Sequence, residues 1–262
     1  MSEHCLPRAL EHVPQIRDWA AGRRLAFFID LDGTLAPLAP RPELVQLPAR
    51  ARNALVCAAR RHLVCVVSGR SLADLKEKIG IDTIYYAADH GHRIAGPPAS
   101  GIDVEIEGVK EGTMLGAATE LERRLRHVAG VVIEVKEVTL SVHYRLVAAE
   151  ERPLVRRTVA DVARAFPDLR PTEGKLVCEL RPAGTWNKGR AILWLLERLG
   201  RGKSDIYPVC LGDDITDEDM FGAVADWGIS IIVGHPARPT RACYRLRDCD
   251  EVVTLLEALG AW

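Results

Sequence analysis

Two carboxylates and a glycine follow an apolar run near the start of the chain. Asp30, Asp32 and Gly33 lie in the stretch FFIDLDGTLAP, residues 27–37. The apolar run predicts a buried parallel strand, and open α/β sheets bind ligands beyond the carboxyl ends of such strands. There Asp30 can attack phosphorus as a nucleophile, and Asp32 can move protons as general acid and base. The same oxygen-rich corner can hold a hard cation such as Mg²⁺.

Later points in the chain supply the other groups that phosphoryl transfer needs. Ser68 ends a second apolar run, LVCVVSGR, and can donate a hydrogen bond to a phosphoryl oxygen. Lys188 begins an expected helix and brings positive charge to the transition state. Taken singly, such residues are commonest in turns, on surfaces and at helix caps, but this order of motifs favours a phosphoryl-transfer site. The run GDDITDEDMF adds carboxylates that can complete a metal shell, namely Asp213, Asp214 and Asp217.

The elements around these residues alternate between strand and helix, which is typical of a doubly wound parallel sheet in an α/β fold. Apolar runs predict strands that begin near residues 27, 63, 84, 207 and 228. Helical spacing predicts helices over 6–22, 48–61, 71–79, 188–199, 217–225 and 250–259. Each predicted site residue therefore follows a strand or opens a helix at one edge of the sheet.

The pattern changes in the middle of the chain to the order αββαββ. Helices are expected over 112–128 and 150–166, and strands over 131–136, 139–145, 169–173 and 175–181. That order predicts an antiparallel sheet covered by two helices. We expect an inserted α+β cap domain over 101–182, a core formed by 1–100 and 183–262, and hinges at 96–101 and 182–184.

The composition is that of an ordinary globular protein. The 262 residues are 48% hydrophobic and 27% charged, and the net charge of -1 gives no case for nucleic acid or an acidic membrane. No apolar run reaches the roughly 18 residues of a spanning helix, and seven cysteines without a C-x-x-C pair suggest a reduced, cytoplasmic protein. Arg238, Arg241, Arg245 and Arg247 are interpreted as a solvated face.

DLDGT, SGR, a lysine before a helix and GDDITDED resemble the four motifs of the haloacid dehalogenase-like hydrolases, from about residue 25 to the end. These are mostly Mg²⁺-dependent phosphatases with a Rossmann-like core and variable caps. The resemblance implies that Asp30 is the nucleophile and Asp32 the acid and base. It implies that Asp30, Asp213 and the backbone carbonyl of Asp32 hold Mg²⁺, with Asp214 and Asp217 supporting it. We then expect phosphate contacts from Gly33, Thr34, Ser68, Gly69, Arg70 and Lys188.

The predicted cap carries acidic and basic residues at strand spacing. Glu134 and Lys136 lie two apart, and Lys175 and Glu179 four apart, so each pair shares a face. Such a face can hydrogen-bond sugar hydroxyls, although cross-strand ion pairs are the plainer interpretation. With HYR and the pair His90-Gly91, these strings are similar to those of the trehalose-6-phosphate phosphatases. That resemblance implies substrate contacts from His90, Glu134, Lys136, Arg145, Lys175 and Glu179.

The resemblance predicts hydrolysis of trehalose 6-phosphate through an aspartyl-phosphate, by a monomer or weak oligomer whose partner is a small sugar phosphate. His92 and Arg93 follow the HG pair where that family has a small residue and then an acid, and Asp89 precedes it. Another phosphorylated glycoside, such as glucosyl- or mannosylglycerate phosphate, is therefore an alternative. A non-catalytic sugar-phosphate-binding partner of a synthase is disfavoured, since Asp30, Asp32 and Lys188 are all present.

Overall fold

The computed structural model describes residues 6–106, 112–135, 138–174, 176–184, 186–235 and 238–262. The chain divides into two compact units, with 1–105 and 187–262 in unit 1 and 106–186 in unit 2. A mostly parallel sheet in unit 1 and a small antiparallel sheet in unit 2 confirm the predicted fold class. Among the described helices, none combines the length and the apolar character of a membrane span.

Unit 1 is built on an eight-stranded sheet in the order β12-β11-β10-β1-β2-β3-β4-β5. The parallel strands are β1 (Arg24–Ile29), β2 (Leu63–Val67), β3 (Tyr85–Ala88), β10 (Ile206–Gly212), β11 (Ile229–Val233) and β12 (Tyr244–Leu246). Two antiparallel strands, β4 (Arg93–Ala95) and β5 (Asp103–Glu105), extend one edge. The carboxyl ends of β1, β2 and β10 therefore meet at the same edge of the sheet.

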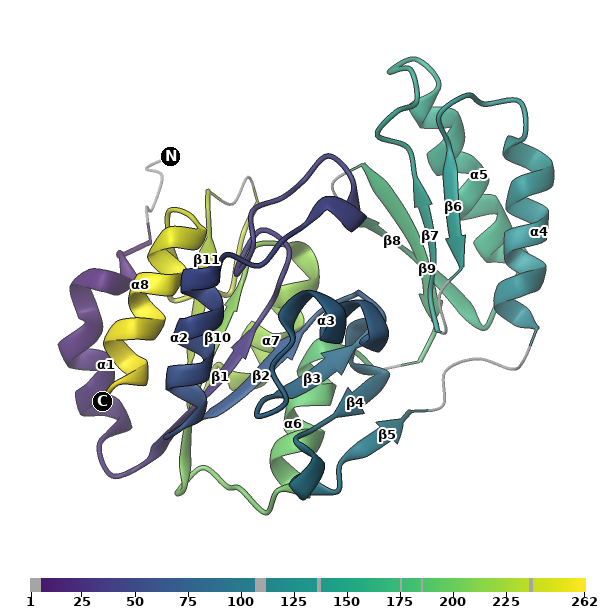
Figure 1. Ribbon diagram of the computed structural model, residues 1–262. Helices are drawn as coiled ribbons and strands as arrows, with labels where there is room; N and C mark the ends of the chain where they lie inside the picture. Colours follow the sequence, from purple (N-terminus) through teal and green to yellow (C-terminus); the bar gives the residue numbers. More distant parts are fainter. Residues whose placement is uncertain (1–5, 107–111, 136–137, 175, 185, 236–237) are drawn as a thin grey trace. The chain divides into compact units, whose positions relative to one another are not determined.

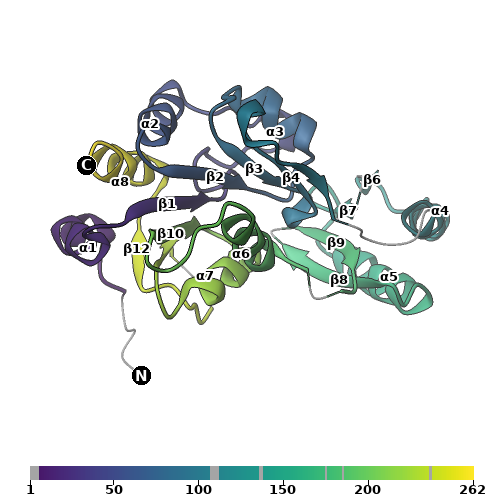
Figure 2. The same ribbon diagram turned by 90° about the horizontal axis from the view of Figure 1, so that it is seen from below.

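Helices cover both faces of this sheet (Figures 1 and 2). One face carries α1 (Val13–Ala20), α2 (Ala49–Ala59), α3 (Leu72–Ile79) and α8 (Cys249–Gly260), and the other carries α6 (Lys188–Arg198) and α7 (Glu218–Val224). Phe27 packs with the first group, whereas Phe28, equally buried, points to the opposite face because strand side chains alternate. The sheet is thus buried on both sides, as its continuous apolar runs require.

Two local predictions in unit 1 need correction. The helix predicted over 6–22 is shorter, and it consists of a 3-10 turn, Ala9–His12, that leads directly into α1. The predicted hinge over 96–101 instead turns β4 into β5, and the Gly96 N–H donates to the Ile102 carbonyl at 2.8 Å. The four arginines interpreted as a solvated face are exposed or half-buried, and each makes a separate contact. These contacts are Arg238 with Asp214, Arg241 with Glu218, Arg245 with the Leu6 carbonyl and Arg247 with Glu251.

Unit 2 is an antiparallel sheet in the order β6-β7-β9-β8, with two helices on one face (Figure 1). Its elements are α4 (Thr113–Leu125), β6 (Val132–Val135), β7 (Leu140–His143), α5 (Arg152–Ala165), β8 (Leu169–Gly174) and β9 (Val177–Pro182). Leu140 and Leu180 are fully buried and pack with residues of both helices. The order αββαββ is therefore confirmed, with a core of its own.

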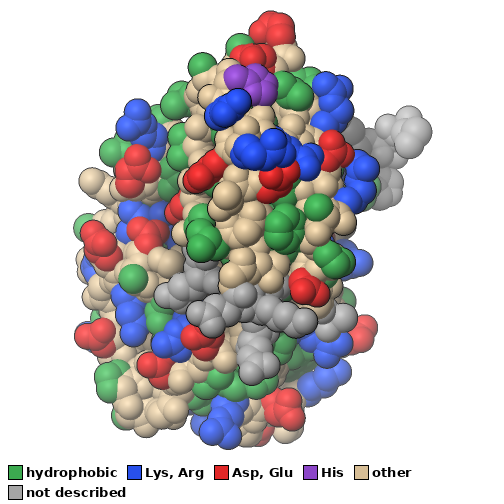
Figure 3. All heavy atoms as spheres, turned by 90° about the vertical axis from the view of Figure 1, so that its right-hand side faces the viewer, with side chains coloured by type: hydrophobic (Ala, Val, Ile, Leu, Met, Phe, Trp, Pro, Cys, Tyr) green, Lys and Arg blue, Asp and Glu red, His purple; other side chains and the backbone are tan. Residues whose placement is uncertain are grey.

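The outward sides of the unit 2 helices carry paired charges. Glu120 accepts hydrogen bonds from Arg123 and Arg124 on α4, and Asp161 accepts one from Arg164 on α5. Figure 3 shows acidic and basic side chains intermingled on the face it displays. Mixed charges at helical spacing are typical of a solvated surface.

Candidate active site

Asp30 and Lys188 meet at the carboxyl edge of the unit 1 sheet. Asp30 directly follows β1 and is 6% exposed, and Lys188, the first residue of α6, is 2% exposed. The Lys188 ammonium donates to Asp30 Oδ1 at 2.8 Å and to Asp217 Oδ1 at 2.7 Å. The side chain of Asn187 caps α6, and this cap helps to fix the start of the helix, where Lys188 lies. The result is a buried cation held between two carboxylates.

The charges of this group depend on one another. Burial raises the pKa of Asp30, as do the neighbouring carboxylates, while Lys188 lowers it, and the pKa stays above its ordinary value. Burial lowers the pKa of Lys188, but the attraction of Asp217 and Asp30 is larger and raises it. A second positive charge at this point would lower the pKa of Asp30, as Lys188 does. It would thus favour the ionised carboxylate that a nucleophile needs.

The acidic loop after β10 lies against the turn after β1. Asp217 is fully buried, and its Oδ2 accepts from the backbone N–H groups of Asp213 and Asp214, both at 3.0 Å. Gly33 has φ +90°, and a Cβ there would overlap the Asp213 carboxylate. Only glycine allows this backbone conformation and this approach without strain. Asp213 is thereby brought beside the Asp30 turn.

Among the described residues, Asp30, Asp213 and Asp217 each offer an oxygen, and these oxygens lie within 4.8 Å of one another. Carboxylate oxygens are the ligands that hard divalent cations prefer. Asp217 accepts from Lys188 and from two backbone amides, and Asp30 also accepts from Lys188. The cluster of three carboxylates therefore fits a divalent cation, and the individual metal contacts of Asp30 and Asp213 stay predictions.

Asp32 is held by an arginine. Arg70 Nε and Nη2 donate to the two Asp32 oxygens at 2.6 and 2.7 Å, and Nη1 donates to Asp74 at 2.5 Å. Burial lowers the pKa of Arg70, but Asp32 and Asp74 outweigh burial and raise it. The phosphate contact expected of Arg70 stays a prediction, since its guanidinium here orients Asp32. Asp74 was not predicted, although its i,i+4 spacing from Arg70 is a usable signal.

Ser68 and His90 lie together at the end of β2. Ser68 is 2% exposed, and its carbonyl accepts from the His90 N–H at 2.9 Å. A Cβ at Gly69 would overlap the His90 ring, so the imidazole packs on the Gly69 backbone. Asp89 and His90 have φ +48° and +55°, a conformation that residues other than glycine adopt at a cost. This backbone conformation places the His90 ring beside the predicted phosphate-binding turn.

The turn after β1 uses its own backbone groups. The Gly33 N–H donates to the Ala36 carbonyl at 2.8 Å, and the Thr34 N–H to the Leu31 carbonyl at 3.3 Å. The Thr34 side chain is fully buried. These bonds fix the turn, and the phosphate contacts of Gly33 and Thr34 stay predictions.

A polar row crosses the unit 2 sheet. Glu134 is opposite Ser141, Ser141 is opposite Glu179, and Glu179 is opposite Thr172. Directly opposed residues share a face, and this face is not the one that Leu140 presents to the helices. The structure thus brings Glu134 and Glu179, both predicted, onto one face of one sheet.

Further polar side chains join this row. Ser141 Oγ donates to Glu179 Oε1 at 3.2 Å, Arg181 donates to Glu179 Oε2, and His143 Nε2 lies 3.0 Å from Glu134 Oε2. Ser141, His143 and Arg181 were not assigned from the sequence, although period-2 spacing from Glu179 points to Arg181. Arg145 lies in the turn after β7 and is exposed. The predicted residues Lys136 and Lys175 lie outside the described residues.

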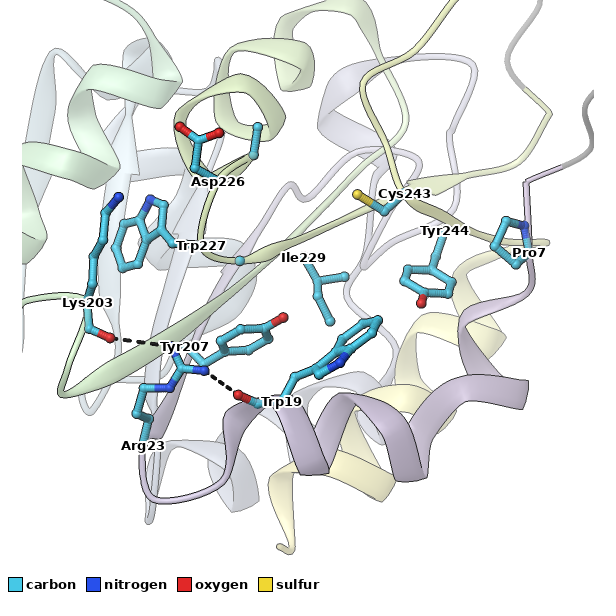
Figure 4. Close-up of a pocket in the computed structure, with 12 residues that line it drawn as sticks. Pro7, Trp19, Arg23, Lys203, Tyr207, Asp226, Trp227, Ile229, Cys243 and Tyr244 are labelled. Atoms are coloured by element: carbon cyan, nitrogen blue, oxygen red, sulfur yellow. Dashed lines mark hydrogen bonds between the residues drawn. The ribbon is translucent and has the colours of Figure 1, made fainter.

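A groove of about 670 Å³ lies at the amino ends of the unit 1 strands, away from the carboxyl ends that carry Asp30 and Asp213 (Figure 4). Tyr207, Ile229 and Tyr244 line it from the amino ends of their strands, and Trp19 faces them from α1. The guanidinium of Arg23 lies 4.6 Å from the centre of the Tyr207 ring. None of the predicted site residues lines this groove, so its size does not make it the reaction site.

Comparisons with known proteins find relatives that are phosphatases, as this arrangement of residues would suggest. The sequence profile of the trehalose-phosphatase family matches residues 28–250. A rice (Oryza sativa) protein described as "Probable trehalose-phosphate phosphatase 2" is 36% identical over 280 residues, which covers 98% of this chain and 73% of that protein. A Mycobacterium tuberculosis protein described as an uncharacterized glycosyl hydrolase is 38% identical, and the match covers 95% of this chain but only 19% of that longer protein.

A solved structure extends the likeness to the fold. The C-terminal domain of the Candida albicans trehalose-6-phosphate phosphatase has a TM-score of 0.85 at 22% identity, over 99% of each chain. A haloacid dehalogenase-like hydrolase from Bacteroides thetaiotaomicron has a TM-score of 0.67 at 15% identity, over 90% of this chain and 99% of the other. The fold is therefore that of the haloacid dehalogenase-like hydrolases.

Proposed function

This chain belongs to the trehalose-phosphatase family, and from that premise we propose that it hydrolyses trehalose 6-phosphate to trehalose and phosphate. The observation that carries the proposal is the buried Lys188 ammonium, which joins Asp30 to Asp217 beside the Asp213 loop. A carboxylate nucleophile, a fixed cation and further carboxylates on one sheet edge are what phosphoryl transfer requires.

The reaction divides into two displacements at phosphorus. Asp30 attacks the phosphoryl group, and the bond to the sugar oxygen breaks as Asp32 protonates that oxygen. Water then attacks the aspartyl-phosphate, Asp32 takes its proton, and the Asp30 carboxylate is restored. Arg70 keeps the Asp32 carboxyl group in one orientation through both steps. Lys188 and Ser68 stabilise the negative charge that develops on the phosphoryl oxygens.

We assign the divalent cation as Mg²⁺, held by Asp30, Asp213 and the backbone carbonyl of Asp32, with Asp214 and Asp217 as supports. The small size of Mg²⁺ suits a few carboxylates completed by water and phosphate oxygens. When bound, the cation supplies positive charge to the phosphoryl oxygens and favours the ionised form of Asp30. The remaining phosphate contacts are assigned to Gly33, Thr34, Ser68, Gly69, Arg70 and Lys188.

We assign unit 1 as the catalytic core and unit 2 as the cap that selects the sugar. Glu134 and Glu179 offer acceptors to sugar hydroxyls, and the cross-strand row fixes their positions. His143 orients Glu134, and Arg181 and Ser141 orient Glu179. Lys136, Arg145, Lys175 and His90 are assigned to the same task.

The departure at His92 and Arg93 leaves other glycoside phosphates open as substrates. In the structure Arg93 Nη1 lies 2.7 Å from Asp103 Oδ1, so its charge is paired within the β4–β5 edge. Arg93 therefore gives those substrates no specific support.

Phosphate release tests the proposal. The chain should release phosphate from trehalose 6-phosphate in Mg²⁺ and not in EDTA, with a kcat/KM at least about tenfold above that for glucose 6-phosphate or glucosylglycerate phosphate. A preference for either of the other two esters would refute the proposed substrate while leaving the phosphoryl chemistry in place.

A further inference from the structure

Glu218 follows the acidic loop and is fixed by a segment distant in the sequence. Its Oε1 accepts from Thr240 Oγ1 at 2.6 Å, and its Oε2 accepts from the Arg241 N–H at 2.8 Å. Glu218 is the first residue of α7 and directly follows Asp217. Both carboxylate oxygens therefore tie the end of the acidic loop to the chain between β11 and β12.

That distant segment is anchored to the sheet. The Ser230 hydroxyl, on β11, donates to the Arg241 carbonyl at 3.1 Å, and the Cys243 N–H donates to the Ser230 carbonyl at 2.8 Å. Thr240 Oγ1 also accepts from the Ala242 N–H at 3.1 Å, which leaves its own proton for Glu218. A continuous series of hydrogen bonds thus runs from β11 to Glu218.

Asp217 connects Glu218 to the other carboxylates of the loop. Its side chain holds the backbone of Asp213 and Asp214, and the backbone of Glu218 follows it directly. On the other side, a Cβ at Gly189 of α6 would overlap the Asp219 carbonyl. The first turn of α7 is therefore fixed from two sides, so a shift of Glu218 would displace Asp217 and then Asp213.

We propose that Glu218, with Thr240 and the Arg241 amide, is a positioning residue that sets the affinity of the Asp213–Asp217 loop for its divalent cation. The inference rests on the proposed function only in taking that loop as the cation site. Groups that orient metal ligands without touching the metal change the affinity by about 10- to 100-fold. Sequence motifs give Glu218 no such role, because the partner segment lies about twenty residues further along the chain.

The test measures cation binding without substrate. Glu218→Gln and Thr240→Val each remove the Thr240 hydrogen bond or weaken it, and Mn²⁺ binding is followed by the electron paramagnetic resonance signal of the free ion. The Mn²⁺ dissociation constant should rise about tenfold in both variants. In the double variant the Mn²⁺ dissociation constant should rise no further than in the single variant with the larger effect, because both changes act on one hydrogen bond. An Mn²⁺ affinity within twofold of the unaltered chain in both variants would overturn the proposal.

Glu257→Gln is the matched control. Glu257 lies on α8 and also accepts two hydrogen bonds, from Arg50 at 2.9 and 2.6 Å. The Mn²⁺ affinity of the Glu257→Gln variant should be unchanged. A loss of affinity equal to that in Glu218→Gln would show a general effect and refute the specific role of Glu218. If Glu218→Gln does not fold, Thr240→Val, which keeps the side-chain shape, decides the question.

Kinetics separate positioning from substrate binding. In Glu218→Gln the Mg²⁺ concentration that gives half-maximal phosphate release should rise by the same factor as the Mn²⁺ constant. KM for the phosphate ester at saturating Mg²⁺ should stay unchanged, and a rise in that KM alone would contradict the inference. If the unaltered chain binds Mn²⁺ but releases phosphate from no ester, the proposed function is refuted. The role of Glu218 in cation binding then still stands, provided that its variants bind Mn²⁺ more weakly.

Discussion

Asp32 and Arg70 face each other through two parallel hydrogen bonds of 2.6 and 2.7 Å. A bidentate pair of this kind fixes the position of a carboxylate and also its plane. In the proposed mechanism Asp32 gives a proton to the leaving oxygen and then takes one from water, and both transfers depend on the orientation of its carboxyl group. The role proposed for Arg70 is therefore to orient Asp32, and a contact with phosphate would be a second role.

Arg70→Lys separates these two roles. A lysine keeps the positive charge but cannot form the bidentate pair. If Arg70 acts by orienting Asp32, kcat for phosphate release should fall about tenfold or more with KM nearly unchanged. Steady-state kinetics at saturating Mg²⁺ measure both constants. A rise in KM at constant kcat would instead assign Arg70 to phosphate binding.

The residues that follow strands could be predicted from the sequence. Asp30, Lys188 and Asp213 converge because each follows a strand or opens a helix at the same edge of a parallel sheet. The pairing of Arg70 with Asp32 could not be predicted, because it depends on how one long side chain lies, whereas Asp74 at i,i+4 from Arg70 left a signal that was not used. Pairing inside a site is decided by side-chain rotamers, which motif spacing does not fix.

At the scale of elements, the N-terminal segment is joined to the last helix through Glu251. This carboxylate, with its side chain 5% exposed, accepts from the Arg247 N–H at 2.7 Å, from the Arg247 guanidinium at 2.5 Å and from Arg8. Burial raises the pKa of Glu251, but the hydrogen bonds from Arg247 and Arg8 outweigh burial and lower it. The ion pairs thus hold the chain before α1 against α8.

Glu251→Gln should lower the free energy of unfolding at pH 7 by about 2 kcal/mol, since it removes charged hydrogen bonds at a buried position. A folded-state pKa below the ordinary 4.5 gives stability that is present above that pH and is lost as the pH falls through the folded value. The difference between the two proteins should therefore shrink below pH 4.5. Urea unfolding at a series of pH values checks this, and a constant difference would contradict it.

Element length explains which strands the sequence predicted. β1, β2 and β10 are apolar runs of five to seven residues that no helical period interrupts. β4, β5 and β12 have three residues each, too few to show a period, and they were missed. The glycine and prolines at 96–98 were assigned to a hinge because the turn they form in a hairpin has the same composition.

At the scale of the whole molecule, the chain forms two units with separate cores, and our proposal assigns phosphoryl chemistry to unit 1 and sugar selection to unit 2. In unit 2 the face of the sheet away from α4 and α5 carries the polar row, and the other face is its core. Selection should therefore be alterable without touching catalysis, provided that the change is made on the polar face.

Glu134→Gln should raise KM for trehalose 6-phosphate about tenfold and leave the hydrolysis of p-nitrophenyl phosphate unchanged, because the small ester has no sugar to contact. Glu173→Gln on β8 is the matched control. Glu173 lies 2.7 Å from Arg156 of α5, on the helix side of the same sheet. Its change should alter neither reaction. Equal losses on both esters in Glu134→Gln would count against a sugar-selecting sheet.

The most direct test of the central claim is to identify the residue that carries the phosphoryl group. The chain is mixed with trehalose 6-phosphate and Mg²⁺ for a single turnover, quenched in acid and treated with borohydride, which reduces an acyl phosphate to an alcohol and releases phosphate. Mass spectrometry should find homoserine at position 30, and Asp30→Asn should release no phosphate and yield none. Homoserine at another position, or phosphate release from Asp30→Asn, would contradict the account.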